Sequence, residues 1–191
     1  MTLKKGVKFV GQILTTDLSE EGNTDADSPV FPCVPEALLD PKCFMTGPAS
    51  FGHRRSGGAR KHAGIDIYLK DGEDHSIFAI ESGIVLRSAL FYNDTYAIEI
   101  EGETGIIYRY CELIPANGIT VGTTVEAGDC IGTAARVLTH LPVMLHLEMY
   151  TGITSGPLTV RDNEPYSRRT DLRDPTMFVM YLQNKARGTK F

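Results

Sequence analysis

The chain has 191 residues, a length that suits one domain with modest extensions. Hydrophobic residues make up 42% of it and charged residues 23%, which excludes wholesale disorder, collagen and coiled coil. The formal net charge of −5 argues against general nucleic-acid binding, which needs a basic surface, and no stretch approaches the roughly 18 apolar residues of a membrane span.

The N-terminal part predicts an extension followed by a linker. Residues 1–16 alternate loosely between apolar and polar and predict a short strand, whereas residues 17–30 are acidic and contain Gly and Pro, as in an exposed loop. The lysines Lys4 and Lys5 are not followed by the apolar run of a cleavable signal peptide. We therefore expect a cytosolic protein, or one exported by a route without such a signal, as in a phage particle or an injection system.

A dense series of β-type segments runs from about residue 62 to residue 150. Short β-branched runs separated by polar turns at regular spacing predict an antiparallel sheet. Ile98 and Ile100 alternate with Glu99 and Glu101, so we expect one buried face and one face toward water. The predicted strands cover residues 65–68, 77–80, 83–86, 96–100, 106–110 and 144–149.

The C-terminal part predicts an irregular excursion and then a helix. Residues 151–173 are polar and contain Gly and Pro. Asp174 is the expected N-cap of the helix, with Pro175 at its first position. The predicted fold class is mostly β with a C-terminal helix, and the predicted domains are an N-terminal extension and linker over residues 1–45 and one folded domain over residues 46–191.

Four cysteines leave the disulfide state open. An even number permits two bridges in three pairings, but the chain is long enough to form a core without them, so we expect reduced thiols. The spacing of Cys33, Cys43, Cys111 and Cys130 fits no zinc ribbon.

Two histidines and an aspartate have the pattern of a metal site. His62 and Asp66 are four residues apart in HAGID, and even separation along an extended strand places both on one side. His146 lies on a later predicted strand. Two imidazoles and a carboxylate are a typical three-ligand set for catalytic zinc, with a fourth position left for water. Alone, the HxxxD pattern is weak, because a surface histidine and a turn aspartate produce it too.

The order of motifs around these residues resembles the LytM/lysostaphin-type zinc peptidases of family M23. HAGIDI resembles the family's H-x-G-x-D-I segment, ITVGTTVEAGDCIG its "V..G..V..Gq.IG" segment, and LHLEMY its "HLHFE" segment. The resemblance runs from about Ser50 to Tyr150. It implies an antiparallel β core of LytM type, Zn²⁺ bound by His62, Asp66 and His146, and a groove for peptidoglycan stem or cross-bridge peptides, or for a protein partner.

Two positions depart from the family's pattern. The first His of its HxH corresponds to Met144, and the His of its YxHL segment corresponds to Glu112. In the family, these histidines hold and deprotonate the attacking water and stabilise the charged intermediate, whereas a thioether can do neither. Glu112 could act as a base beside a metal. His140, in the preceding loop, is a second candidate, although an exposed loop histidine is the simpler interpretation. Glu112 and His140 are the predicted catalytic residues.

These departures leave several functions open. The first is a zinc-binding domain that is directed at peptidoglycan peptides and is catalytically impaired or a pseudopeptidase. The second is an active zinc metalloendopeptidase that cleaves cell-wall cross-links with a non-standard base. A structural component of a phage or injection apparatus is compatible with either chemistry.

Two further features lie near the predicted ligands. Glu148 matches the family's Glu after HxH, and we expect it to be structural or to orient a ligand. A basic cluster precedes the first ligand and is either a solvated loop or a wall that contacts carboxylates of a peptide. Its members are Arg54, Arg55, Arg60 and Lys61.

Overall fold

Antiparallel strand pairing organises the protein, as the sequence predicts. The structure, a computed structural model, describes residues 28–188, so the predicted strand at residues 1–16 and most of the linker lie outside it. The strands are β1 (Arg54–Arg55), β2 (Arg60–Lys61), β3 (Ile65–Leu69), β4 (Ser76–Phe78), β5 (Gly83–Leu90), β6 (Tyr96–Gly102), β7 (Ile107–Pro115), β8 (Thr124–Val125), β9 (Cys130–Ala134), β10 (Val143–Tyr150) and β11 (Leu172–Arg173). The helices are the short 3₁₀ turns η2 (Pro35–Ala37), η3 (Cys43–Met45), η4 (Gly47–Ala49) and η5 (Ser56–Gly58), and the α-helix α1 (Thr176–Ala186).

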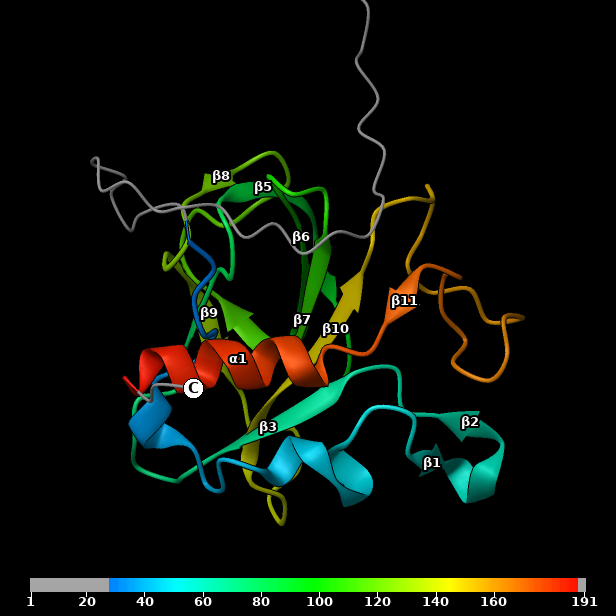
Figure 1. Ribbon diagram of the computed structural model, residues 1–191, viewed down its shortest axis with the longest axis horizontal. Coiled ribbons are helices and arrows are strands. Elements are labelled where there is room, and N and C mark those ends of the chain that lie inside the picture. The colour runs from blue at the N-terminus through cyan, green and yellow to red at the C-terminus, as the bar shows by residue number, and fades with distance from the viewer. Residues whose placement is uncertain (1–27, 189–191) are drawn as a thin grey trace, which may run out of the picture.

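Nine strands form one sheet, and β1 and β2 form a separate hairpin. The main path through the sheet is β11-β10-β7-β6-β5-β8, with β3 added to β10 and β9 joined to both β7 and β4. In Figure 1, β10 crosses the middle of the molecule, and the β1–β2 hairpin lies at the edge beyond β3. Because β10 pairs with both β3 and β7, segments far apart in the sequence become neighbours at β10.

One face of this sheet forms the hydrophobic core. Alternate residues of the central strands point to it, and α1 packs there through Val179 and Leu182. The ring of Phe178 stacks on that of Tyr108 with centroids 6.2 Å apart. Each such buried side chain contributes roughly 1.5–3 kcal/mol to folding. The fully buried members include Ile65, Ile67, Ile98, Ile100, Tyr108, Tyr110, Leu145 and Leu147.

The sequence predicts that Glu99 and Glu101 of β6 both face water, and this prediction is wrong for Glu99. Glu99 is only 7% exposed, whereas Glu101 is exposed as expected. The strand register explains the difference, because it aligns Glu99 with Arg109 and Arg109 with Glu148 across three strands. A buried cation between two carboxylates allows charged residues to occupy this face.

The C-terminal helix starts two residues after the predicted N-cap. Pro175 occupies the N-cap and Thr176 is the first helical residue. The Asp174 carboxylate nevertheless accepts a hydrogen bond from the Thr176 N–H at 2.9 Å, so it still satisfies a free donor of the first turn. No helix in residues 28–188 is long and apolar enough to cross a membrane. All four cysteines are unbridged, as expected.

The predicted excursion runs from the end of β10 to β11, and a buried ion pair inside it helps to hold its two ends together. Arg169 donates two hydrogen bonds to the Asp171 carboxylate, at 2.7 and 2.9 Å. The same carboxylate accepts the Gly152 N–H at 3.0 Å. Burial alone would raise the pKa of Asp171, but these donors and the Arg169 charge hold it below its ordinary value.

A carboxyl whose pKa is depressed by folding stabilises the protein above its unfolded pKa of about 3.9 and loses that contribution as pH falls through the lower folded value. We expect Asp171→Asn to lower the free energy of unfolding at pH 7 by about 1–3 kcal/mol. The deficit relative to wild type should shrink toward pH 3. Urea unfolding followed by circular dichroism measures both, with the exposed Asp162→Asn as control; an equal deficit at both pH values would contradict this role.

Candidate metal centre

The predicted ligands come together because of strand register. Asp66 on β3 lies opposite His146 on β10, so both side chains emerge side by side from the face opposite the core. His62 is placed beside them by the segment that leads into β3. Gly64 permits this approach, since a Cβ there would lie 2.2 Å from the Leu147 carbonyl oxygen. The side chains of all three predicted ligands are buried.

Three donor atoms of these residues converge. The distance from His62 Nε2 to His146 Nδ1 is 3.0 Å, from His146 Nδ1 to Asp66 Oδ1 2.9 Å, and from His62 Nε2 to Asp66 Oδ1 3.1 Å. Ligands about 2.0–2.1 Å from a tetrahedral zinc ion lie about 3.3 Å apart. The observed spacing is therefore close to that of one face of a zinc coordination tetrahedron.

Each imidazole is also held through its other ring nitrogen. His62 Nδ1 donates to the Ser50 carbonyl at 2.9 Å, and His146 Nε2 donates to the Glu148 carboxylate at 3.1 Å. In the neutral rings, these bonds leave the lone pairs of His62 Nε2 and His146 Nδ1 pointing at each other and at Asp66. Three lone pairs at such distances repel unless a cation lies among them, so the donor set fits a metal ion.

When no metal is bound, a proton on His146 supplies the positive charge among these donor atoms. Burial would lower the pKa of His146, but hydrogen bonds to Asp66 and Glu148 raise it to about 9. Burial would likewise raise the pKa of Asp66, but the two histidines lower it below its ordinary range. A metal must displace this proton in order to bind.

Arginines hold the two carboxylates in place: the half-buried Arg55 holds Asp66, and the buried Arg168 and Arg109 hold Glu148. Arg55 donates to Asp66 Oδ2 at 2.7 Å, which leaves Oδ1 directed at the histidines. Arg168 donates to Glu148 Oε1 from Nε at 2.8 Å, and its Nη2 lies 2.7 Å from the same oxygen. Arg109 lies 3.4 Å from Glu148 Oε2. Glu148 thus orients His146, as one of its two expected roles requires.

A small cavity of about 160 Å³ opens over the donors. Met144 lies on the wall of this cavity. It is on β10, two residues before His146, and its thioether cannot accept a proton. Glu112 lies on another wall. The full lining consists of Arg55, Arg60, His62, Ala63, Asp66, Phe91, Glu112, Met144, His146 and Arg168.

A β-bulge places Glu112 in this lining. Tyr96 pairs with Leu113 and Ala97 with Cys111, so Glu112 is the extra residue of β7, and its φ is +68°. Such bulges occur next to active sites, where they redirect a side chain. Within residues 28–188, Glu112 Oε2 is buried with no hydrogen-bond partner, and burial raises the pKa of this carboxyl.

Only one of the two predicted catalytic residues lies at the cavity. Glu112 lines the cavity, whereas His140 is exposed in the loop before β10 and is not among the lining residues. Arg168 was missed from the sequence, because it lies in a polar loop without periodicity. Only the pairing of Thr159 with Arg168 and the bonds to Glu148 reveal its place.

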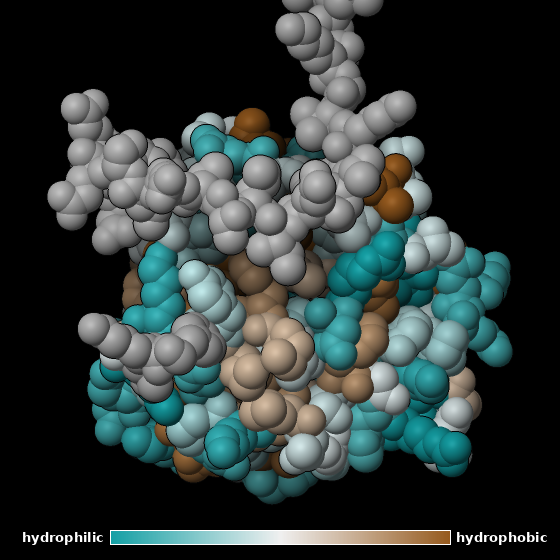
Figure 2. Space-filling view, viewed as in Figure 1, coloured by the Kyte–Doolittle hydropathy of each residue, from teal (hydrophilic) through white to brown (hydrophobic). Residues whose placement is uncertain are grey.

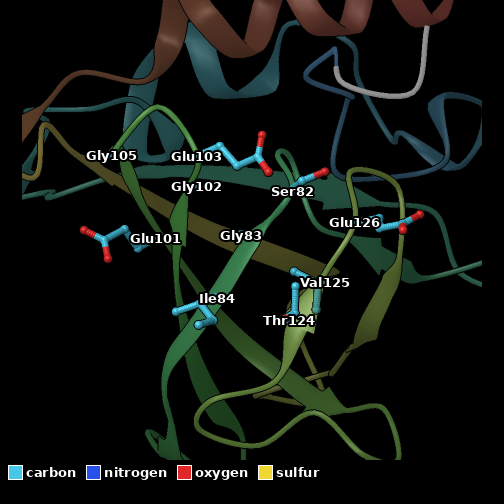
Figure 3. A pocket seen from close by; sticks show the side chains of 10 residues that line it. All are labelled: Ser82, Gly83, Ile84, Glu101, Gly102, Glu103, Gly105, Thr124, Val125 and Glu126. Atoms are coloured by element: carbon cyan, nitrogen blue, oxygen red, sulfur yellow. The ribbon is translucent and has the colours of Figure 1, made fainter. Parts of the chain in front are cut away.

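A larger cavity of about 750 Å³ lies at the β5–β6–β8 end of the sheet (Figure 3). It contains three carboxylates, but Glu101, Glu103 and Glu126 project in different directions. No histidine or cysteine lines it. In the described part of the chain, the only group of three or more metal-type side chains is His62, Asp66 and His146.

Fold and site together define an antiparallel β domain with a His/Asp/His cluster suited to a metal. Residues 60–157, just over half of the chain, match the sequence model of peptidase family M23. The chain therefore belongs to peptidase family M23, which confirms the resemblance seen in the sequence. No curated protein sequence gives a match.

Solved structures show the same fold. The antimicrobial peptidase lysostaphin from Staphylococcus simulans aligns with a TM-score of 0.55 and 19% identity, over 82% of this chain and 56% of lysostaphin. The protein cbpa from L. salivarius REN aligns with a TM-score of 0.56 and 18% identity, over 83% and 99%. LytU aligns with a TM-score of 0.54 and 22% identity, over 75% and 93%. The chain thus spans little more than half the length of this lysostaphin structure.

We expect Arg168→Gln to weaken zinc binding about 10- to 100-fold, because Glu148 would lose its main anchor and would hold His146 less firmly. The exposed Arg161→Gln, in the same excursion, is the matched control and should bind zinc like wild type. Competition with a chromogenic zinc chelator measures both, with circular dichroism to establish folding. Equal zinc affinity in folded Arg168→Gln and wild type would contradict the anchoring role.

Proposed function

We propose that the protein is a zinc-binding M23 domain that recognises peptidoglycan peptides and is catalytically impaired. The observation that carries the proposal is the convergence of the His62, Asp66 and His146 donor atoms at 2.9–3.1 Å, beside a cavity whose wall carries Met144. Two imidazoles and a carboxylate are a common donor set for zinc.

The residues around the site favour binding over turnover. Zinc held there supplies Lewis acidity toward a peptide carbonyl and toward water. Proton transfer then requires a base, and general acid–base catalysis is worth about 10²- to 10⁴-fold. Met144 cannot accept a proton, and Glu112 in its ionised form cannot donate a hydrogen bond to an oxyanion. The site therefore lacks the two groups that ordinary peptide hydrolysis needs beside the metal, a histidine base and a hydrogen-bond donor to the oxyanion.

The second candidate is an active peptidase in which Glu112 is the base. The bulge that directs Glu112 into the cavity, and the unpaired oxygen of its carboxylate, favour this alternative. Burial raises its pKa toward the range in which a carboxylate is a more effective base. Glu112→Gln would abolish such activity while leaving zinc in place.

The metal part of the proposal predicts about one zinc per chain in elemental analysis of the purified protein. His62→Ala and Asp66→Ala should each lose most of it, because two donors hold zinc far less tightly than three. His75→Ala, at a turn away from the site, is the control and should keep it. Zinc-free wild type that stays metal-free after incubation with zinc would refute the proposal.

The catalytic part predicts little release of new amino termini from peptidoglycan sacculi or oligoglycine peptides. The double substitution Met144→His with Glu112→His should raise the rate about 100-fold, because it supplies a proton acceptor and a donor at the two cavity walls. Chelation should remove the gained activity. Fast, chelator-sensitive release by wild type would refute impairment, and its loss in Glu112→Gln would establish the second candidate instead.

A further inference from the structure

The β1–β2 hairpin places an excess of positive charge at the rim of the site. Its two short strands consist of Arg54, Arg55, Arg60 and Lys61, and no acidic residue occurs between Asp40 and Asp66. The chain as a whole has a net charge of −5, so the positive charge of this hairpin is opposite in sign to that of the protein. Figure 2 shows a hydrophilic surface at the edge where this hairpin and the excursion lie, in contrast to the apolar surface near α1.

The hairpin register sorts the four cations into two pairs. Arg55 lies opposite Arg60, and Arg54 lies opposite Lys61, so each pair shares one face of the hairpin. Arg55 and Arg60 line the cavity over the predicted metal ligands, whereas Arg54 and Lys61 are not among its lining residues. Like charges directly opposite each other destabilise a strand pair, so this arrangement carries a cost.

In the part of the chain that the structure describes, one of the cavity arginines lacks an acidic partner. Arg55 is paired with Asp66, and Arg168 is paired with Glu148. Arg60 is exposed, and no acidic side chain of residues 28–188 pairs with it. Its guanidinium therefore retains its full set of donors at the rim of the cavity.

The hairpin is positioned firmly enough for recognition. The Lys61 N–H donates to the Pro165 carbonyl of the excursion at 2.8 Å. The His62 N–H donates to the His53 carbonyl at 2.8 Å. Arg60 thus lies two residues before the predicted metal ligand His62. The backbone that follows it is hydrogen-bonded to the excursion at Lys61 and to His53 at His62.

We propose that Arg60 is a specificity residue that binds a carboxylate of the peptide held in this cavity. This inference rests on the proposed peptide recognition and adds the substrate class: peptides that carry a free carboxylate next to the bound segment. Guanidinium groups recognise carboxylates through paired, charge-assisted hydrogen bonds. The Glu112 carboxylate does not occupy the Arg60 guanidinium in place of a peptide carboxylate. It is half-buried on the cavity wall and does not pair with Arg60.

Calorimetric titration of the zinc-loaded full chain with the tetrapeptide L-Ala-γ-D-Glu-L-Lys-D-Ala tests the proposal. The free acid should bind about fivefold more tightly than a form amidated at both carboxylates. Forms amidated only at D-Glu or only at the terminal D-Ala identify which carboxylate Arg60 binds. Either single loss of affinity supports the proposal.

Arg60→Gln should abolish the preference for the free acid, whereas Lys61→Gln should retain it. The two variants remove the same charge from the same strand, on opposite faces, so the pair separates a specific contact from general attraction. Binding of all forms with equal affinity, or equal effects of the two variants, would overturn the assignment of Arg60 and leave peptide recognition intact. If none of the peptides binds, peptide recognition itself fails, and this inference fails with it.

Discussion

The site depends on one antiparallel register, in which β10 aligns His146 with Asp66 on one side and with Cys111 on the other. A shift of one residue in either pairing would turn Asp66 or His146 toward the core, because side chains alternate between faces. The register is fixed by the apolar residues on the opposite face of the same strands. Core packing and donor placement are therefore consequences of the same strand alternation.

A carboxylate buried as deeply as that of Glu148 requires hydrogen-bond and ion-pair partners. Glu148 is fully buried and meets His146, Arg168, Arg109 and the hydroxyl of Tyr150. Such a network stabilises only when it is complete, because an unpaired buried charge is costly. The excursion supplies Arg168, so this loop contributes to the proposed metal centre although it lies outside the predicted ligand strands.

Much of the fold could be predicted from the sequence, and so could the proximity of three residues of the site. The alternation of apolar residues and the polar turns predicted the main strands, and the motif order predicted the family. The partners of these residues could not be predicted. Burial of Glu99 depends on its alignment with Arg109, and the position of Glu112 depends on a bulge opposite Tyr96 and Ala97. Neither register nor bulge leaves a periodic signal in the sequence.

The most direct test of the account is a crystal structure of the zinc-loaded protein with diffraction data collected on both sides of the zinc absorption edge. The account predicts one anomalous peak, with the ion about 2.0–2.2 Å from His62 Nε2, Asp66 Oδ1 and His146 Nδ1. Met144 should lie on the cavity wall without contact to the ion. The absence of a peak at this position, or a zinc ion bound through other residues, would contradict it.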